Sequence, residues 1–247
     1  MAAPSSTLAG DLALKEKELI TLVGAGGKTT LMFALARELL AGHKKIITTT
    51  TTKIYLPEPG QSPALILGGT EVFPEIEAFL ARYGHLTWAA GRAAENKLTG
   101  VYPPDLSALW AMGLTDFLIV EADGSAQRPI KAPGADEPVV PKETTLFIAV
   151  LGLAALNKPL NQEFAFRPEI ISRLTGIPLD SPMTLEGIAR LMVHPQGGLK
   201  GWLPNMRAFI ILNQADKEPG SGMGYRLAER IEELAEGKIS KVIIQKR

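Results

Sequence analysis

The sequence predicts an α/β protein built on a mainly parallel sheet that is sandwiched by helices. Three observations predict this class: strand-like and helix-like segments alternate, a glycine-rich turn joins the first strand to the first long helix, and a later apolar strand ends in carboxylates. Such alternation favours parallel strands, because each crossover helix returns the chain to the same end of the sheet. With 247 residues, 46% of them hydrophobic, the chain can bury a substantial core.

The individual elements follow from local patterns, taken in chain order. Short runs rich in β-branched and aromatic residues predict strands at Leu19–Val23, Lys45–Thr49, Ala64–Leu67, Leu86–Ala89, Phe117–Val120, Leu146–Val150, Ala208–Leu212 and Lys241–Ile244. Apolar residues at helical spacing predict helices at Thr29–Ala41, Val72–Tyr83, Leu106–Met112, Pro168–Leu174, Leu185–Met192 and Tyr225–Ala235.

The domain organisation is expected to be simple. Residues 1–15 are expected to form a flexible N-terminus, and residues 16–247 a single α/β domain. The segment 152–205 joins two predicted strands through short helices and many turns, and it is longer than an ordinary connection. We therefore expect a helical or loop insertion there.

Composition excludes several classes of protein. The 26 acidic and 26 basic residues balance, which argues against a nucleic-acid partner. The longest apolar run, Leu146 to Leu156, is too short to span a bilayer, and residues 1–14 lack a secretory pattern. We expect no membrane contact and a cytoplasmic location. The chain has no cysteine, which excludes disulfides, thiolate zinc sites and a catalytic cysteine.

The first predicted strand runs into a glycine-rich loop, Gly24-Ala25-Gly26-Gly27-Lys28-Thr29-Thr30. Glycines let backbone N–H groups turn around an anion, and the helix N-terminus adds partial positive charge. We expect this loop to bind the phosphates of ATP or GTP, with Lys28 on the outer phosphates and Thr29 on Mg²⁺. The usual pattern has glycine at position 22, where this chain has Leu22, so a plain glycine turn is the alternative. The strand before and the helix after favour a P-loop NTPase-like fold.

A second motif follows the buried strand Phe117–Val120, where the chain reads Glu121-Ala122-Asp123-Gly124. Phosphate-loop proteins place an acid near Mg²⁺ and the terminal phosphate in this way. We expect Glu121 and Asp123 to orient the metal or a water molecule. The alternative is an ordinary polar turn, since Asp-Gly is common in turns.

Three further segments supply candidate ligand contacts. Thr50, Thr52 and Lys53 end a threonine run that follows the second predicted strand, although the strand preference of threonine explains the run equally well. Arg128 and Lys131 lie on proline-stiffened backbone and are expected to meet a substrate or transition-state charge, with solvated surface cations as the alternative. Glu137 is a weaker substrate candidate.

The segment Asn213-Gln214-Ala215-Asp216 follows a predicted buried strand. It is similar to the N-K-x-D element with which GTPases read guanine. Glutamine replaces the usual lysine, so guanine preference is left open. We expect Asn213 and Asp216 to meet the base of the nucleotide.

Taken together, these segments resemble the YqeC family, accessory proteins for selenium-dependent molybdenum hydroxylases. The resemblance extends over residues 16–247 and is most specific after Glu121. It implies a nucleotide-dependent step in the maturation of such an enzyme. It also implies the hydroxylase, or its cofactor-insertion machinery, as partner. It rests on the glycine-rich loop, Thr52-Lys53, Glu121-Ala122-Asp123-Gly124-Ser125, Arg128-Pro129-Ile130-Lys131-Ala132-Pro133, Glu137-Pro138 and Asn213-Gln214-Ala215-Asp216.

Three functions remain open at this point. The first is a switch-like NTPase that assists maturation. The second is a kinase or nucleotidyltransferase acting on a molybdopterin-type cofactor, with Lys28, Thr29 and Glu121 holding Mg²⁺-nucleotide and Arg128 and Lys131 orienting the acceptor. The third is a module that senses nucleotide without catalysis.

Overall fold

The computed structural model describes residues 7–217 and 222–245. The chain divides into two compact units. Unit 1 comprises Met1–Ile20, Thr29–Glu121 and Pro141–Thr144, and unit 2 comprises Thr21–Lys28, Ala122–Val140 and Thr145–Arg247. Both units are α/β, with mostly parallel strands flanked by helices, as the sequence predicts.

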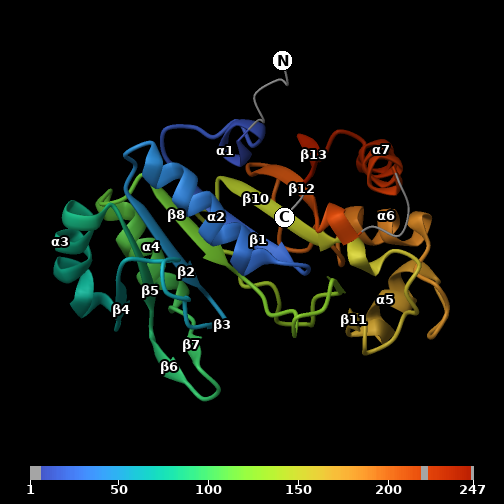
Figure 1. Ribbon diagram of the computed structural model, residues 1–247, viewed down its shortest axis with the longest axis horizontal. Helices are drawn as coiled ribbons and strands as arrows, with labels where there is room; N and C mark the ends of the chain where they lie inside the picture. The colour runs from blue at the N-terminus through green and yellow to red at the C-terminus, as the bar shows by residue number, and fades with distance from the viewer. Residues whose placement is uncertain (1–6, 218–221, 246–247) are drawn as a thin grey trace. The chain divides into compact units, whose positions relative to one another are not determined.

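Unit 1 is built on parallel strands in the order β8 (Phe117–Glu121), β2 (Ile46–Thr50), β5 (His85–Ala89) and β4 (Leu65–Leu67). In the register of β2 with β8, Thr50 pairs with Glu121, so both strands end together. A separate antiparallel sheet of three short strands extends away from them (Figure 1). It contains β3 (Lys53–Tyr55), β7 (Lys97–Thr99) and β6 (Gly91–Ala93).

Prolines and glycines explain where two of the helices of unit 1 begin and end. They are α1 (Leu8–Asp11), α2 (Lys28–Ala41), the 3₁₀ turn η1 (Thr70–Val72), α3 (Phe73–Tyr83) and α4 (Pro103–Met112). Prolines occupy the first turns of α3 and α4, where a missing N–H costs nothing. Each of these two helices ends at a left-handed glycine, Gly84 or Gly113.

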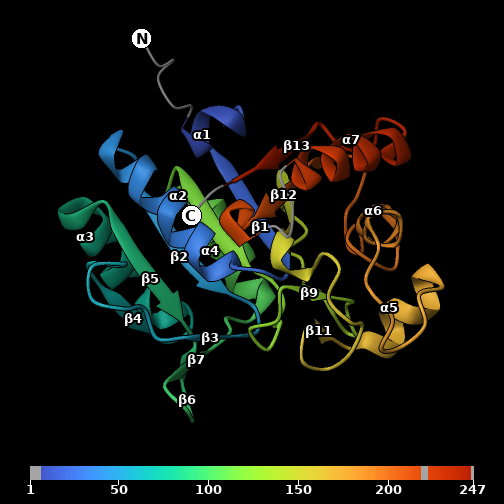
Figure 2. The same ribbon diagram turned by 45° about the vertical axis from the view of Figure 1, so that its right-hand side comes forward.

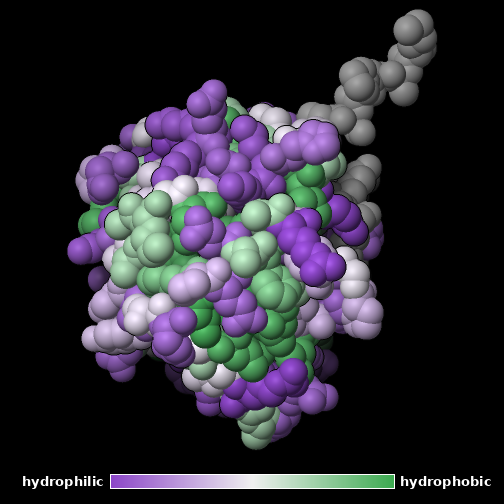
Figure 3. Space-filling model, turned by 90° about the vertical axis from the view of Figure 1, so that its left-hand side faces the viewer, coloured by the Kyte–Doolittle hydropathy of each residue, from purple (hydrophilic) through white to green (hydrophobic). Residues whose placement is uncertain are grey.

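The core of unit 1 forms around Trp88, which is fully buried on β5. Its ring meets Phe73 edge-on at 5.7 Å between centroids, and its Nε1–H donates to the Gly68 carbonyl at 3.0 Å. Figure 3 looks onto the end of this unit that carries α3, where hydrophobic and polar residues are interspersed.

Unit 2 contains the parallel strands β10 (Leu146–Gly152), β12 (Arg207–Asn213) and β13 (Lys241–Ile244). The last residue of β10, Gly152, pairs with the last residue of β12, Asn213. The order continues from β10 to β1 (Glu18–Gly24), whose last four residues belong to this unit. A second, two-stranded parallel sheet joins β9 (Ile130–Lys131) to β11 (Ala165–Phe166).

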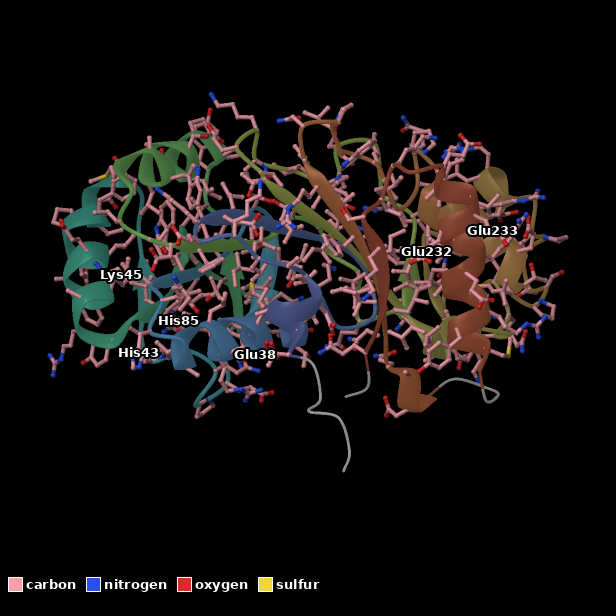
Figure 4. The ribbon with its side chains drawn as sticks, turned by 90° about the horizontal axis from the view of Figure 1, so that it is seen from above. Glu38, His43, Lys45, His85, Glu232 and Glu233 are labelled. Atoms are coloured by element: carbon pink, nitrogen blue, oxygen red, sulfur yellow. The ribbon has the colours of Figure 1, made fainter. Side chains whose placement is uncertain are left out.

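The helices of unit 2 are α5 (Pro168–Thr175), α6 (Leu185–Val193) and α7 (Met223–Ala235), with the 3₁₀ turns η2 (Leu153–Ala155) and η3 (Ala215–Lys217). Figure 2 shows α7 alongside β13. In Figure 4, Glu232 and Glu233 lie on α7, and the Glu232 carboxylate accepts from Val242 N on β13 at 2.9 Å, whereas Glu233 pairs with Arg230 at 2.8 Å.

All eight predicted strands and all six predicted helices are present, with ends that differ by at most three residues. The short strands β3, β6, β7, β9 and β11 were not predicted. The predicted insertion contains β11 in addition to α5 and α6. The predicted domain boundaries stay a prediction.

The predicted N-terminus divides into two parts. Residues 1–6 lie outside the described residues, whereas residues 8–11 form α1, which buries Leu8. The backbone N–H of Ala9 also donates to Glu38 at 3.0 Å. Among the described residues, no helix is both long and apolar enough to cross a membrane.

Candidate functional site

The glycine-rich loop connects the end of β1 to the start of α2. Gly24, Gly26 and Gly27 have φ angles of 93°, 83° and 114°, a region that side chains disfavour. A Cβ on Gly24 would lie 2.3 Å from the Val150 carbonyl oxygen, and one on Gly26 would lie 2.1 Å from the Gly152 nitrogen. Gly24 and Gly26 are therefore required by conformation and by close packing against β10, whereas a Cβ on Gly27 would meet the Asn213 side chain of β12.

Three amides of this loop donate to acceptors within the protein. Gly24 N donates to the carboxylate of Asp123 at 3.1 Å, Ala25 N to Val150 O at 2.9 Å, and Gly26 N to Arg128 O at 3.2 Å. The amides of Gly24, Ala25 and Gly26 are therefore occupied by acceptors of the protein itself. The first turn of an α-helix, by contrast, carries N–H groups that no intrahelical carbonyl accepts.

Lys28 opens α2 with a side chain that is only 1% exposed. Its Nζ donates to the Gly24 carbonyl at 2.6 Å and lies 3.2 Å from Asp123 Oδ1. The ammonium group is thus folded back over the loop that precedes it. A lysine in this position can reach an anion at the helix start by a change of rotamer alone.

Asp123 is the centre of a chain of charged contacts. Its second oxygen lies 2.9 Å from Lys131 Nζ, which also contacts Glu137 Oε2 at 2.8 Å and donates to Gly124 O at 2.6 Å. Glu137 in turn receives two hydrogen bonds from Arg167, at 2.7 and 3.2 Å. We call Lys28, Asp123, Lys131, Glu137 and Arg167 the ion-pair chain.

The electrostatics of Glu137 reflect these partners. Burial raises the pKa of this carboxyl, but hydrogen bonds from Arg167 and Lys131 outweigh burial and lower the pKa to about 2. The Arg167 guanidinium also stacks on Phe166, with its carbon 4.4 Å from the ring centroid. Both charged groups are therefore held in defined positions.

Glu121 ends β8 in unit 1 and is buried. Its Oε2 accepts from the Thr29 hydroxyl at 2.7 Å, and its backbone carbonyl accepts from Thr50 Oγ1 at 2.8 Å. The structure thus brings together two of the three predicted metal ligands, Thr29 and Glu121. Carboxylate and hydroxyl oxygens suit a hard cation such as Mg²⁺.

Asp123, the third predicted metal ligand, has ammonium groups on both sides. A divalent cation at this carboxylate would be repelled by Lys28 and Lys131. Among the described residues, no group of three or more His, Cys, Asp or Glu side chains forms a metal site. Asp123 is better explained as an acceptor for the loop amide and the two lysines.

The predicted base-contacting residues occupy different surroundings. Asn213 is buried at the end of β12, and its side-chain amide donates to the Gly26 carbonyl at 2.8 Å. This hydrogen bond holds the backbone of the glycine-rich loop in place. Asp216 is exposed in η3.

The remaining predicted contacts are dispersed. The Arg128 guanidinium donates to the Gln162 carbonyl at 2.6 Å, so it lies outside the ion-pair chain. Thr52 N donates to Thr50 Oγ1 at 3.0 Å, Lys53 is exposed at the start of β3, and Thr30 is exposed on α2.

A small cavity of about 20 Å³ adjoins the ion-pair chain, enough for about one water molecule. Asp123, Lys131 and Gly24 contribute to its wall, together with Lys200. The Lys200 ammonium donates to the carbonyls of Gly134 and Ala135 and so holds the backbone at these two residues.

Arg167 is the site residue that sequence reasoning missed. Thirty residues separate it from Glu137. Arg167 is the residue before α5 and has a φ of 62°. It follows Phe166, which pairs with Lys131 where β11 lies beside β9. No local pattern in the sequence marks this long-range pairing.

The fold and this loop define a class: an α/β protein in which a glycine-rich turn after a buried strand positions a lysine at a helix start. The model of the family described as "YqeC protein" matches residues 20–169. A protein of Escherichia coli (strain K12) named "Uncharacterized protein YqeC" is 32% identical over 210 residues, which cover 85% of this chain and 81% of that protein. The chain belongs to the YqeC family.

Proposed function

We propose that this protein binds Mg²⁺-ATP or Mg²⁺-GTP at the glycine-rich loop and assists the maturation of a selenium-dependent molybdenum hydroxylase. The observation that carries the proposal is Lys28. Its buried ammonium lies at the first residue of a 14-residue helix, over a loop of left-handed glycines. Helix dipole, first-turn amides and ammonium all favour a bound phosphate.

Separate residues would contact the phosphates, the Mg²⁺ ion and the base of the nucleotide. The amides from Gly27 onward and Lys28 would bind the phosphates. Thr29 follows Lys28 on α2, and its hydroxyl with the Glu121 carboxylate 2.7 Å away would hold Mg²⁺, which supplies charge neutralisation. Because Asn213 supports the loop, Asp216 is the remaining candidate for the base.

The maturation role rests on the family resemblance. Selenium carried as a perselenide needs a thiol, and this chain has no cysteine. The protein would therefore act on a cofactor, or control delivery by a partner, through its nucleotide state. Switch proteins of this kind hydrolyse nucleotide slowly until the target completes the site.

Hydrolysis assays test this role. We expect slow release of phosphate by the purified protein and faster release when the immature hydroxylase is added, with both rates lost in Lys28→Met. Brisk hydrolysis without a partner would contradict the switch. Transfer of phosphate or nucleotide to purified molybdopterin would instead identify a transfer enzyme.

A further inference from the structure

The ion-pair chain alternates in charge along its whole length. Three cations, Lys28, Lys131 and Arg167, alternate with two carboxylates, Asp123 and Glu137, at contact distances of 2.7 to 3.2 Å. The side chains of Lys28, Asp123 and Lys131 are at most 2% exposed. Water therefore screens these charges little, and each charge depends on its neighbours for compensation.

Lys28 is the member of the chain that meets the glycine-rich loop, through its hydrogen bond to the Gly24 carbonyl. A buried ammonium group at a helix start favours an anionic ligand.

Two lysines share the carboxylate of Asp123, one on each oxygen. Lys28 lies 3.2 Å from Oδ1, and Lys131 lies 2.9 Å from Oδ2. If Lys28 turns toward a phosphate, Lys131 still compensates Asp123. Without Lys131, Lys28 would be the only remaining lysine on that carboxylate.

We propose that Lys131 is a positioning residue that releases Lys28 for the nucleotide by compensating Asp123, and that Arg167 fixes Lys131 through Glu137. This assignment rests on the proposed nucleotide site. It replaces the expectation that Lys131 contacts the substrate. The ammonium of Lys131 already has three acceptors: Asp123, Glu137 and the Gly124 carbonyl.

A double-mutant cycle tests the assignment, with binding of Mg²⁺-ATP and Mg²⁺-GTP measured by calorimetry. Lys131→Met is expected to weaken binding about tenfold or more, because Asp123 then retains Lys28. Asp123→Asn keeps an oxygen for the Gly24 amide but removes the charge, so binding is expected to be unchanged or tighter. The double variant is expected to bind as Asp123→Asn does.

The alternative result is clear-cut. If Lys131 touches the ligand directly, Lys131→Met weakens binding equally with and without the Asp123 charge, and the assignment is wrong. If Lys131→Met does not fold, Asp123→Asn alone decides, since a tenfold loss in that variant overturns the assignment. Lys142→Met, which alters a lysine that is 83% exposed, serves as the matched control.

The two proposals fail in distinguishable ways. Absence of binding by the folded wild-type protein contradicts the nucleotide site itself. Normal wild-type binding with additive effects in the cycle contradicts only the role of Lys131.

Discussion

Arg167 and Glu137 form a bidentate ion pair: Nη1 donates to Oε2 at 2.7 Å and Nη2 donates to Oε1 at 3.2 Å. This paired geometry is the strongest form of an ion pair between these residue types. It links the residue before α5 to the segment Ala122–Val140, which carries Glu137, within unit 2.

The first prediction concerns this pair. Arg167→Met is expected to destabilise the protein by about 2 kcal/mol at neutral pH, because the Glu137 carboxylate loses two charged hydrogen bonds. The pKa of Glu137 is lowered from 4.5 to about 2, so its contribution is present above pH 4.5 and is lost as the pH falls through 2. Urea unfolding at several pH values is expected to show the difference between wild type and variant shrinking toward pH 2. A difference that does not vary with pH would contradict this.

The second prediction concerns the close packing of the glycine-rich loop. Gly26→Ala is expected to lower the free energy of unfolding by about 3 kcal/mol or more. The new methyl group would collide with the backbone of Gly152, and alanine disfavours the φ of +83° at this position. Gly60→Ala is the matched control, with a φ of +88° and open space around the added atom, and is expected to cost about 1 kcal/mol. Equal losses in the two variants would mean that packing against β10 contributes nothing.

The third prediction concerns His85, which Figure 4 labels in unit 1. Burial lowers its pKa from 6.5 to about 4, and its Nε2 lies 3.2 Å from the Thr48 hydroxyl. The unfolded state therefore binds more protons between these pH values, and the free energy of unfolding is expected to fall by about 3 kcal/mol as the pH drops from 6.5 to 4. Glutamine keeps polar atoms but does not titrate, so His85→Gln is expected to lose less stability over this window. Parallel pH curves for the two proteins would show that His85 titrates normally.

The longer elements could be predicted from sequence because their patterns are local. Leu146–Val150 and Ala208–Leu212 are continuous apolar runs, and α3 and α4 end at glycines. The first turn of α4 was missed because Pro103 and Pro104 interrupt the apolar pattern, although proline fits a helix start. The two-residue strands β9 and β11 depend on a partner far along the chain, so no local pattern marks them.

The candidate site likewise has parts that local sequence predicts and parts that depend on distant residues. The glycine-rich loop, and the acids at the end of β8 and just after it, could be found from residue types and spacing alone. The partners of each side chain, by contrast, depend on packing. Asn213 binds the Gly26 carbonyl, and Lys131 contacts two carboxylates. Arg167 follows β11, which pairs with β9, the strand that contains Lys131.

Calorimetric titration of the purified protein with Mg²⁺-ATP and with Mg²⁺-GTP tests the central claim most directly. We expect one nucleotide to bind per chain, with affinity reduced at least about tenfold in Lys28→Met and unchanged in Lys142→Met. If the folded protein releases no heat of binding with either nucleotide, or if Lys28→Met binds as tightly as wild type, then the glycine-rich loop and Lys28 do not form a phosphate site.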